Sequence, residues 1–384
     1  MADNKENKVL NVPALRFPEF TDEWHKQSLG EIGETIIGLT YKPSDVVESN
    51  GTIVLRSSNI KNGVIDYSDL VRVNKPIKER IITKENDILI CARNGSQRLI
   101  GKNAIIKKED ANNTFGAFMM VYRSKDNPFI LPLLSTKRYF SQVGENLGAR
   151  INQITTSDFN GFDFYFPNSH AERAKIAELF RLIDERIATK NKIIEDLKKL
   201  KSAIYQEMFG SLVAQTLKLG QVAEVVKGKQ VNGTELLEQG DYYVMNGGTL
   251  PSGWLNKYNT EANTISISEG GNSCGYVQYN TSPYWSGGHC YSLKILHPQE
   301  TSDLYLYHFL KWQEENIMAL RIGSGLPNIQ KKDLLHFPVI LPTITQQNKI
   351  VLILSAIEEK VSCEISITQY FVKQKEYLLS QLFI

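Results

Sequence analysis

The sequence predicts an α+β protein in which two β-rich globular domains are separated by a long antiparallel two-helix coiled coil and related by an internal pseudo-twofold repeat. Three observations predict this fold: landmarks that recur at a constant spacing, two helix starts of one type, and two long apolar stripes with helical periodicity. A chain of 384 residues has room for two or three domains at roughly 150 residues each.

The first landmarks are strands that end in glycine-containing turns. Ile88–Ala92 runs into Arg93–Ser96, and Ile265–Glu269 runs into Gly270–Ser273. Strand-forming residues followed by Gly and Asn are typical of a strand that ends in a turn. Each half of the chain therefore contains a strand that leads into a polar loop.

Further landmarks flank these strands in the same order. Leu29-Gly30 and Leu219-Gly220 each open an apolar stretch, which ends at Gly38 in the first half and at Gly228 in the second. Later, FGAFMMVY (Phe115–Tyr122) aligns with SGGHCYSL (Ser286–Leu293) as a strand with a glycine pivot. The shared order indicates one fold that is encoded twice.

The end of each half repeats most clearly. One constant spacing relates Ile154 to Ile329, Asp158 to Asp333, Phe162 to Phe337 and Pro167 to Pro342. The spacing falls by one after the prolines, which makes Asn168 the extra residue. Ser169 with Glu172, and Thr343 with Gln346, then have the S/T-x-x-E/Q spacing of a helix capping box.

A long apolar stripe follows each of these helix starts. A stripe of about 40 residues needs an equally long partner, because a globular helix averages only ~11 residues. We expect the two helices to pair with each other through Ile176, Ile183, Ile187, Ile194, Leu197 and Ile204 of the first and Ile350, Ile357, Val361, Phe371 and Leu378 of the second. Gly210 is positioned to end the first helix.

These elements define the expected domain organisation. It comprises an N-terminal leader (1–16), a first globular domain (17–168), a first spacer helix (169–210), a second globular domain (211–342) and a second spacer helix (343–384).

Composition excludes several classes of protein. Hydrophobic residues make up 42% of the chain without any run of about 18 that could cross a membrane, and the polar start MADNKENKV lacks a signal sequence. We therefore expect a cytoplasmic protein with no membrane contact. The four cysteines form no CxxC pair, so we expect reduced thiols and no metal site. The net charge of +2 neither predicts nor excludes nucleic-acid binding.

The predicted architecture is compatible with DNA binding. Two binding domains on a rigid spacer match a split DNA target with an approximate twofold axis. Further features are the opening Val12-Pro13-x-x-Arg16-Phe17-Pro18-x-Phe20 with Trp24, and the capped helices that end in YQEMF (Tyr205–Phe209) and LSQLF (Leu379–Phe383). Through these motifs and its duplicated halves, the chain resembles the specificity subunits of type I restriction-modification systems. The resemblance covers nearly the whole sequence.

The resemblance implies a non-catalytic, sequence-specific DNA-binding subunit. Each globular half would be a target recognition domain that reads one part of a bipartite sequence in double-stranded DNA. The paired helices would set the spacing and dock two modification subunits, which are adenine methyltransferases. Restriction/translocase subunits would complete the complex. It also implies no cofactor in this chain, with S-adenosylmethionine, ATP and Mg²⁺ on the partner subunits.

Motifs within the chain agree with an absence of catalysis. Asn127-Pro128-Phe129 has one proline where the base-binding loop of an amino-methyltransferase has two. The segment from Gly95 to Asn103 is one residue too long for a phosphate-binding loop and has Asn where Ser or Thr would bind magnesium. Neither HExxH nor GxSxG occurs.

Residues that read bases should be polar or cationic and lie on loops at strand ends. In the first domain the candidates are Arg56, Asn59, Arg93, Asn94, Ser96 and Arg98, together with Arg150 and Gln153. In the second domain they are Asn246, Asn272, Ser273, Trp285, Ser286 and Arg321. For each of them, an ordinary solvated turn residue is an equally good interpretation.

Two other functions are consistent with the same sequence. One is a pseudo-dimeric DNA-binding regulator that works without a methyltransferase. The other is a coiled-coil scaffold with two ligand-binding modules, for which Tyr242, Tyr243, Trp254 and Trp285 would form the platform. Salt-dependent duplex binding would distinguish the scaffold from the DNA binders, and co-purification with a methyltransferase would distinguish those two from each other.

Overall fold

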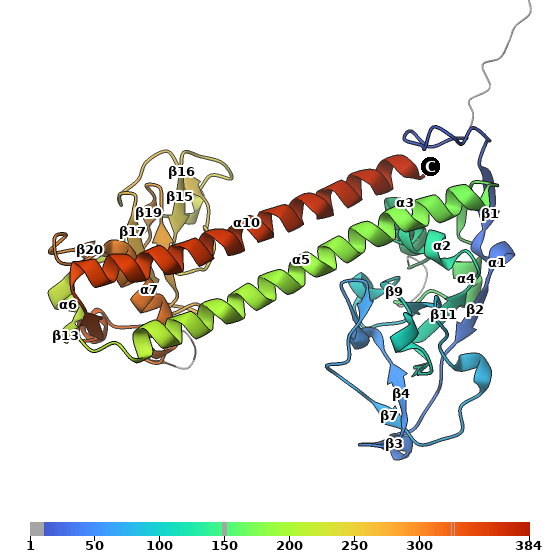
Figure 1. Ribbon diagram of the computed structural model, residues 1–384, viewed down its shortest axis with the longest axis horizontal. Helices are drawn as coiled ribbons and strands as arrows, with labels where there is room; N and C mark the ends of the chain where they lie inside the picture. The colour runs from blue at the N-terminus through green and yellow to red at the C-terminus, as the bar shows by residue number, and fades with distance from the viewer. Residues whose placement is uncertain (1–10, 148–151, 324, 326) are drawn as a thin grey trace, which may run out of the picture. The chain divides into compact units, whose positions relative to one another are not determined.

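The computed structural model describes residues 11–147, 152–323, 325 and 327–384. Its elements form two compact units. The first unit contains the chain up to Lys190 together with Ile367–Ile384, and the second contains Asn191–Ser366. Both units have a related order of strands and short helices, and each includes a part of both long helices, α5 (His170–Gly210) and α10 (Ile344–Leu382) (Figure 1).

The first unit is built on a four-stranded antiparallel sheet in the order β2-β11-β8-β9. Its strands are β2 (Glu34–Ile37), β11 (Met119–Arg123), β8 (Ile88–Cys91) and β9 (Asn103–Ile105). Successive side chains of a strand point to opposite faces. Ile88 and Ile90 enter one apolar cluster, and Leu89 and Cys91 enter another. Both faces of the sheet are therefore covered, which explains why β8 is apolar throughout.

Smaller elements surround this sheet. A second sheet in the order β10-β4-β7-β3 consists of β10 (Thr114–Phe115), β4 (Thr52–Leu55), β7 (Arg72–Val73) and β3 (Val46–Val47). Two strand pairs are β1 (His25–Ser28) with β12 (Asp163–Phe166), and β5 (Ile60–Lys61) with β6 (Val64–Ile65). The short helices are α1 (Leu29–Ile32), α2 (Asn127–Leu133), α3 (Lys137–Leu147) and α4 (Thr156–Asn160).

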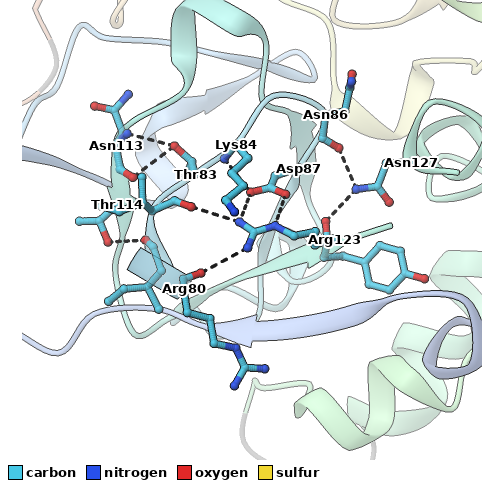
Figure 2. Close-up of polar contacts among 12 residues, drawn as sticks. Arg80, Thr83, Lys84, Asn86, Asp87, Asn113, Thr114, Arg123 and Asn127 are labelled. Atoms are coloured by element: carbon cyan, nitrogen blue, oxygen red, sulfur yellow. Dashed lines mark hydrogen bonds and ion pairs between the residues drawn. The ribbon is translucent and has the colours of Figure 1, made fainter. Parts of the chain in front are cut away.

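A buried ion pair fixes the entry to β8. The Arg123 side chain donates to both carboxylate oxygens of Asp87, from Nε at 2.8 Å and from Nη2 at 2.6 Å (Figure 2). These hydrogen bonds raise the pKa of Arg123. Asp87 is 2% exposed, and Arg123 also reaches the carbonyl oxygen of Ile82 at 3.1 Å. The pair therefore holds the segment before β8 against the end of β11.

Asn127 completes this network. Its Nδ2 donates to the carbonyl oxygens of Asn86 at 2.7 Å and Tyr122 at 2.9 Å (Figure 2). The side chain is fully buried in these framework contacts. The structure thus gives the Asn127-Pro128-Phe129 segment a packing role as the first turn of α2.

The second unit repeats this topology. Its main antiparallel sheet has the order β14-β20-β17-β18, and a smaller sheet has the order β16-β15-β19. The strands are β13 (Gln215–Lys218), β14 (Ala223–Lys227), β15 (Tyr242–Met245), β16 (Trp254–Leu255), β17 (Thr264–Ser268), β18 (Val277–Asn280), β19 (Trp285–Ser286), β20 (Cys290–Ile295) and β21 (Pro338–Leu341). The helices are α6 (Leu219–Val222), α7 (Asp303–Trp312), α8 (Glu314–Met318) and α9 (Lys331–Leu335).

Equivalent backbone hydrogen bonds confirm the predicted internal repeat. The N–H of Leu29 donates to the carbonyl oxygen of Phe162 at 2.9 Å, and that of Leu219 donates to Phe337 at 2.8 Å. In the same way β10 pairs in parallel with β4, and β19 pairs in parallel with β15. The landmarks that recur in the sequence therefore occupy the same places in two copies of one fold.

Two of these landmarks are glycines because of a close backbone approach. A Cβ atom on Gly38 would lie 2.2 Å from the carbonyl oxygen of Gly116, and one on Gly228 would lie 2.1 Å from that of Gly287. Contacts this short with backbone atoms cannot be relieved by a side-chain rotation. Glycine is therefore required at positions 38 and 228, where the backbone passes close to Gly116 and Gly287 of the neighbouring segment.

The long helices are α5 (His170–Gly210) and α10 (Ile344–Leu382), which begin one residue after the predicted caps. Within the first unit they run in opposite directions. Phe180 stacks on Phe383 with ring centroids 5.8 Å apart, and Asp184 pairs with Lys375 at 2.6 Å. The side chains of the first unit that were predicted to pair the helices, Ile176, Ile183, Ile187, Phe371 and Leu378, are buried or half-buried.

The second unit contains the other parts of both helices. Ile204 and Tyr205 of α5 share an apolar cluster with Ile350 of α10. Tyr205 Oη also lies 2.8 Å from Nδ1 of His308 on α7, and burial lowers the pKa of His308 to about 4. The remaining predicted pairing residues here, Ile194, Leu197, Ile357 and Val361, are buried or half-buried.

The helix starts correct the prediction of two reciprocal capping boxes. The backbone N–H of Glu172 donates to Ser169 Oγ at 3.3 Å, but the Glu172 carboxylate accepts from Arg16 Nε at 2.7 Å and Nη2 at 2.8 Å. A bidentate charged partner outcompetes a backbone N–H. These hydrogen bonds raise the pKa of Arg16. At the second start, Gln346 Oε1 accepts from Thr343 N at 3.3 Å and Oγ1 at 3.0 Å. Each helix start thus keeps half of the box.

Within the described ranges, we find no helix whose length and apolar character would allow it to span a membrane.

Candidate nucleic-acid interface

Four loops of the first unit meet beside the end of β8. They comprise residues 56–59, 93–98, 116–118 and 152–153. The N–H of Arg93 donates to the carbonyl oxygen of Phe118 at 3.0 Å, and Arg93 forms an isolated β-bridge with Gln153. Asn94 Nδ2 donates to Ser57 Oγ at 3.0 Å. Side chains from distant parts of the sequence therefore converge on one surface.

Arg93 and Phe118 form the most distinctive pair on this surface. The Arg93 guanidinium carbon lies 5.1 Å from the centroid of the Phe118 ring, within the range of a cation–π interaction. Both side chains are exposed, and 59% of Phe118 is accessible to solvent. The ring supports the guanidinium while its hydrogen-bond donors remain available. Phe118 was not among the predicted residues, although an aromatic residue beside the Gly116 pivot was a visible signal.

The loop after Arg93 contains three of the predicted residues. Ser96 and Arg98 are exposed. Asn94 is half-buried, and its Oδ1 accepts from the N–H of Ser96 at 3.0 Å. Since both ends of the Asn94 amide are engaged, this side chain shapes the loop. Ser96 and Arg98 stay predictions as base contacts.

The predictions for Arg56 and Asn59 have different outcomes. Arg56 is half-buried, and its Nη2 donates to Asp69 Oδ2 at 2.7 Å, so a base contact would require exchange of that partner. Asn59 is fully buried, and its Nδ2 donates to the carbonyl oxygens of Asp66 and Asp69. We therefore correct Asn59 to a framework residue. Arg150 lies outside the described residues.

The second unit assembles the equivalent loops. They comprise residues 245–247, 269–273, 286–289 and 321–328, of which 324 and 326 are outside the described set. The N–H of Glu269 donates to the carbonyl oxygen of His289 at 2.9 Å, and Gly270 forms an isolated β-bridge with Asn328. The first of these bonds matches the one from the N–H of Ala92 to the carbonyl oxygen of Phe118 at 3.0 Å, and the bridge matches that between Arg93 and Gln153 in the first unit.

Three predicted residues of the second unit lie on these loops with accessible side chains. Asn272 and Arg321 are exposed, and Ser273 is half-buried. They are compatible with contact to a ligand and stay predictions.

The other three predicted residues are engaged within the fold. Asn246 Oδ1 accepts from the N–H of His289 at 3.0 Å. Trp285 Nε1 donates to the carbonyl oxygen of Lys229 at 2.9 Å. Ser286 is 1% exposed, so we correct it to a buried strand residue that cannot reach a base.

The aromatic residues considered for a ligand platform contact different neighbours. Tyr243 stacks on the buried Tyr284 with centroids 5.5 Å apart and an interplanar angle of 10°. Its ring also lies edge-on to Trp254 at 6.3 Å, while Tyr242 packs against Tyr258 at 4.8 Å. Lys257 Nζ lies 5.2 Å from the centroid of the Trp285 ring. Tyr243 is therefore engaged in packing within the fold.

Cys363 is exposed, whereas the other three cysteines are buried. Cys91, Cys274 and Cys290 are buried, and burial raises the pKa of the Cys91 and Cys290 thiols to about 11. Such thiols remain protonated near neutral pH. Among the described residues, no group of three or more His, Cys, Asp or Glu side chains is arranged to hold a metal ion.

The duplicated loop framework is matched by a known sequence family. The family model described as the type I restriction modification DNA specificity domain matches residues 21–199 and again 214–369. The chain belongs to the type I restriction-modification DNA specificity family. The two matches fall on the two copies of the repeat, so each unit contributes the loops of one specificity domain.

Curated members of the specificity family are similar to parts of the chain or to all of it. A putative type I specificity subunit of Mycoplasma pneumoniae is 37% identical over 144 residues, covering 37% of this chain and 38% of the relative. One from Mycoplasma genitalium is 31% identical over 161 residues, covering 42% of each. The chain thus aligns with less than half the length of these two relatives. The putative MjaX specificity subunit of Methanocaldococcus jannaschii is 24% identical over 98% of this chain and 96% of its own.

Solved structures from type I restriction-modification systems share the fold of this chain. The crystal structure of a type I restriction-modification S subunit from M. genitalium has a TM-score of 0.69 at 19% identity, and the match covers 97% of this chain and 99% of that one. A structure from work on complex assembly and conformational transition of the type I system has a TM-score of 0.52 at 16% identity, with 94% and 97% covered.

Proposed function

We propose that the chain is the sequence-specific DNA-binding specificity subunit of a type I restriction-modification complex, and that each unit reads one part of a bipartite target. The observation that carries this proposal is a loop framework built twice with different side chains at equivalent positions. Arg93 and Phe118 occupy it in the first unit, and Gly270 and His289 occupy it in the second. Two copies of one backbone framework that carry different side chains can contact two different base sequences.

The long helices are proposed to set the spacing and to dock two modification subunits. Several large side chains of α10 are exposed, including Leu352 at 74%, Tyr370 at 71% and Tyr377 at 61%. Exposed apolar and aromatic groups of this kind support contact with another protein. We propose that those partners are adenine methyltransferases that use S-adenosylmethionine, and that restriction/translocase subunits with ATP and Mg²⁺ complete the complex in the cytoplasm. The chain itself would then be non-catalytic.

Selection from a randomised duplex pool tests the proposed function. The full chain, purified with a cognate modification subunit, is expected to enrich a motif of two specified half-sites separated by an unspecified gap. A single continuous motif would contradict the bipartite readout. Sequence-specific binding that never requires or recruits the methyltransferase would favour a stand-alone regulator. Absence of salt-dependent duplex binding would favour a scaffold.

Lengthening both long helices is expected to lengthen the gap between the half-sites. Four residues inserted between Lys190 and Asn191 and four between Ser366 and Ile367, where the units divide, add about 6 Å at 1.5 Å per residue. That rise corresponds to about two base pairs at roughly 3.4 Å each. Mapping of methylated adenines in cells checks the result. An insertion of equal length at the exposed Leu250 is the control, and an unaltered gap would disprove the spacer role.

Replacing Arg93 with alanine is expected to relax base preference in one half-site only. If the guanidinium makes a bidentate base contact, the loss of discrimination is about 1–3 kcal/mol at that position. Arg93→Lys distinguishes geometry from charge, because lysine keeps the charge but lacks the planar pair of donors. Competition binding with single-base variants of the selected motif measures the effect. A uniform loss over all sequences would instead indicate a phosphate contact.

A further inference from the structure

His289 of the second unit occupies the place that Phe118 occupies in the first. Each residue immediately precedes a central strand, since β11 begins at Met119 and β20 at Cys290. The carbonyl oxygen of Phe118 accepts from the N–H of Ala92 at 3.0 Å, and that of His289 accepts from Glu269 at 2.9 Å. The His289 side chain is 62% exposed, close to the exposure of Phe118. The Phe118 and His289 side chains therefore occupy equivalent exposed positions in the two units.

The residue beside each ring differs in a way that changes what the ring can contact. In the first unit the Arg93 guanidinium lies over the Phe118 ring. Gly270 takes the equivalent position in the second unit, as the matching β-bridges show. A Cβ atom on Gly270 would lie 3.7 Å from His289 Nδ1, so a larger side chain here would pack against the ring. Since residue 270 is glycine, no side chain at this position covers the imidazole.

Glu269 lies behind the imidazole, at the position of Ala92 in the first unit. Its Oε1 accepts from Lys227 Nζ at 2.7 Å and from Tyr291 Oη at 3.0 Å. Its Oε2 is buried, has no hydrogen-bond partner among the described residues, and lies 3.9 Å from His289 Nδ1. Because a buried carboxylate oxygen without a donor is costly, a small rotation that brings Nδ1–H onto it is favourable. That contact directs Nε2 outward.

The backbone of His289 is also fixed. Its N–H donates to Asn246 Oδ1 at 3.0 Å. Gly247 has a φ of +85°, and a Cβ atom there would lie 3.0 Å from the Cβ of His289. Glycine at this position therefore allows the close approach. A ring that is fixed at its backbone, with one nitrogen 3.9 Å from a carboxylate oxygen, is suited to a directional contact.

We propose that His289 is a base-reading residue of the second unit, that it hydrogen-bonds a base edge of duplex DNA through Nε2, and that Glu269 is its positioning residue. The proposal rests on the proposed DNA-binding function. Equivalent positions of the two units would then contact bases. In the first unit the group is the Arg93 guanidinium, and in the second it is the His289 imidazole.

Selection from a randomised duplex pool by the full chain with its modification subunit tests this assignment. His289→Phe, which installs the residue of the first unit, is expected to reduce discrimination at one or two adjacent positions of one half-site by about 5- to 150-fold. His289→Gln serves as a second variant. Phe118→Leu is the matched control at the equivalent position, and any change that it causes is expected in the other half-site only.

A double-variant test separates positioning from structure. Glu269→Ala is expected to relax the same base position as His289→Phe, and to cause no further change in base preference when His289 is already Phe. Unaltered preference in the His289 variants would overturn the inference, as would an equal loss of affinity for all sequences, which indicates a phosphate contact. A wild-type complex that selects no sequence at all would instead refute the DNA-reading function on which the inference rests.

Discussion

Replacing Glu172 with alanine is expected to lower the free energy of unfolding of the first unit by about 3–5 kcal/mol. The Glu172 carboxylate is 1% exposed and accepts from Arg16 twice and from Trp24 Nε1 at 3.2 Å. Its loss leaves the 12%-exposed Arg16 guanidinium without a counter-charge and the buried indole N–H without an acceptor. An uncompensated buried charge costs more than the net value of the pair.

Urea unfolding of the full chain, followed by probes in each unit, measures this change. Only the transition of the first unit is expected to shift, because all the groups involved belong to it. Glu178→Ala on the same helix is the matched control. Its pair with Arg181 is about half exposed, so the expected change is below about 1 kcal/mol. Equal shifts in the two variants would show that the Arg16–Glu172 pair adds little.

Replacing Asp87 with alanine is expected to destabilise the first unit by about 3 kcal/mol or more. The change removes both hydrogen bonds from Arg123 and an acceptor for the N–H of Lys84, which lies 2.8 Å from Asp87 Oδ2. The segment before β8 loses its anchor. Because β8 leads into the loop of Arg93, weaker DNA discrimination in one half-site is expected together with the lower stability.

A double-mutant cycle tests the cause of this effect. Arg123→Met in the Asp87→Ala background removes the unpaired charge and is expected to recover part of the lost stability. Glu178→Ala, whose pair with Arg181 is about half exposed, serves again as a surface control. If the double variant is as unstable as the sum of the single variants, desolvation of the unpaired Arg123 is not the main cost.

The duplication could be predicted because each landmark answers a local requirement that leaves a mark in the sequence. Gly38 and Gly228 recur because a backbone crossing excludes any Cβ. Strands β8 and β17 recur as buried segments because both faces of each main sheet are covered. The helix starts recur at Ser169 and Thr343, although the predicted partner of the Glu172 carboxylate, the backbone N–H of Ser169, was wrong. Arg16 lies far away in the sequence, and spacing rules detect only local partners.

The candidate reading surfaces were predicted less well, because exposure and hydrogen bonding at a loop depend on neighbours that are distant in sequence. Arg93 and Asn59 are both polar residues at strand ends, yet one projects over Phe118 and the other holds two carbonyl groups in the interior. His289 was not among the predicted base-reading residues, because its segment was interpreted as a glycine-containing turn at a strand end. Its relation to Phe118 was present in the aligned segments, but only the matched backbone hydrogen bonds showed that the two rings share a role.

The packing of Leu382 and Phe383 against Trp24 and Phe129 has a consequence for how the protein is made. The ribosome synthesises residues 367–384 after the whole of the second unit, yet they belong to the first unit. The second unit is continuous in sequence, so its core needs no segment that is synthesised after Ser366. The first unit must wait with part of its apolar surface uncovered. In this chain the domain that is begun first is therefore expected to be finished last.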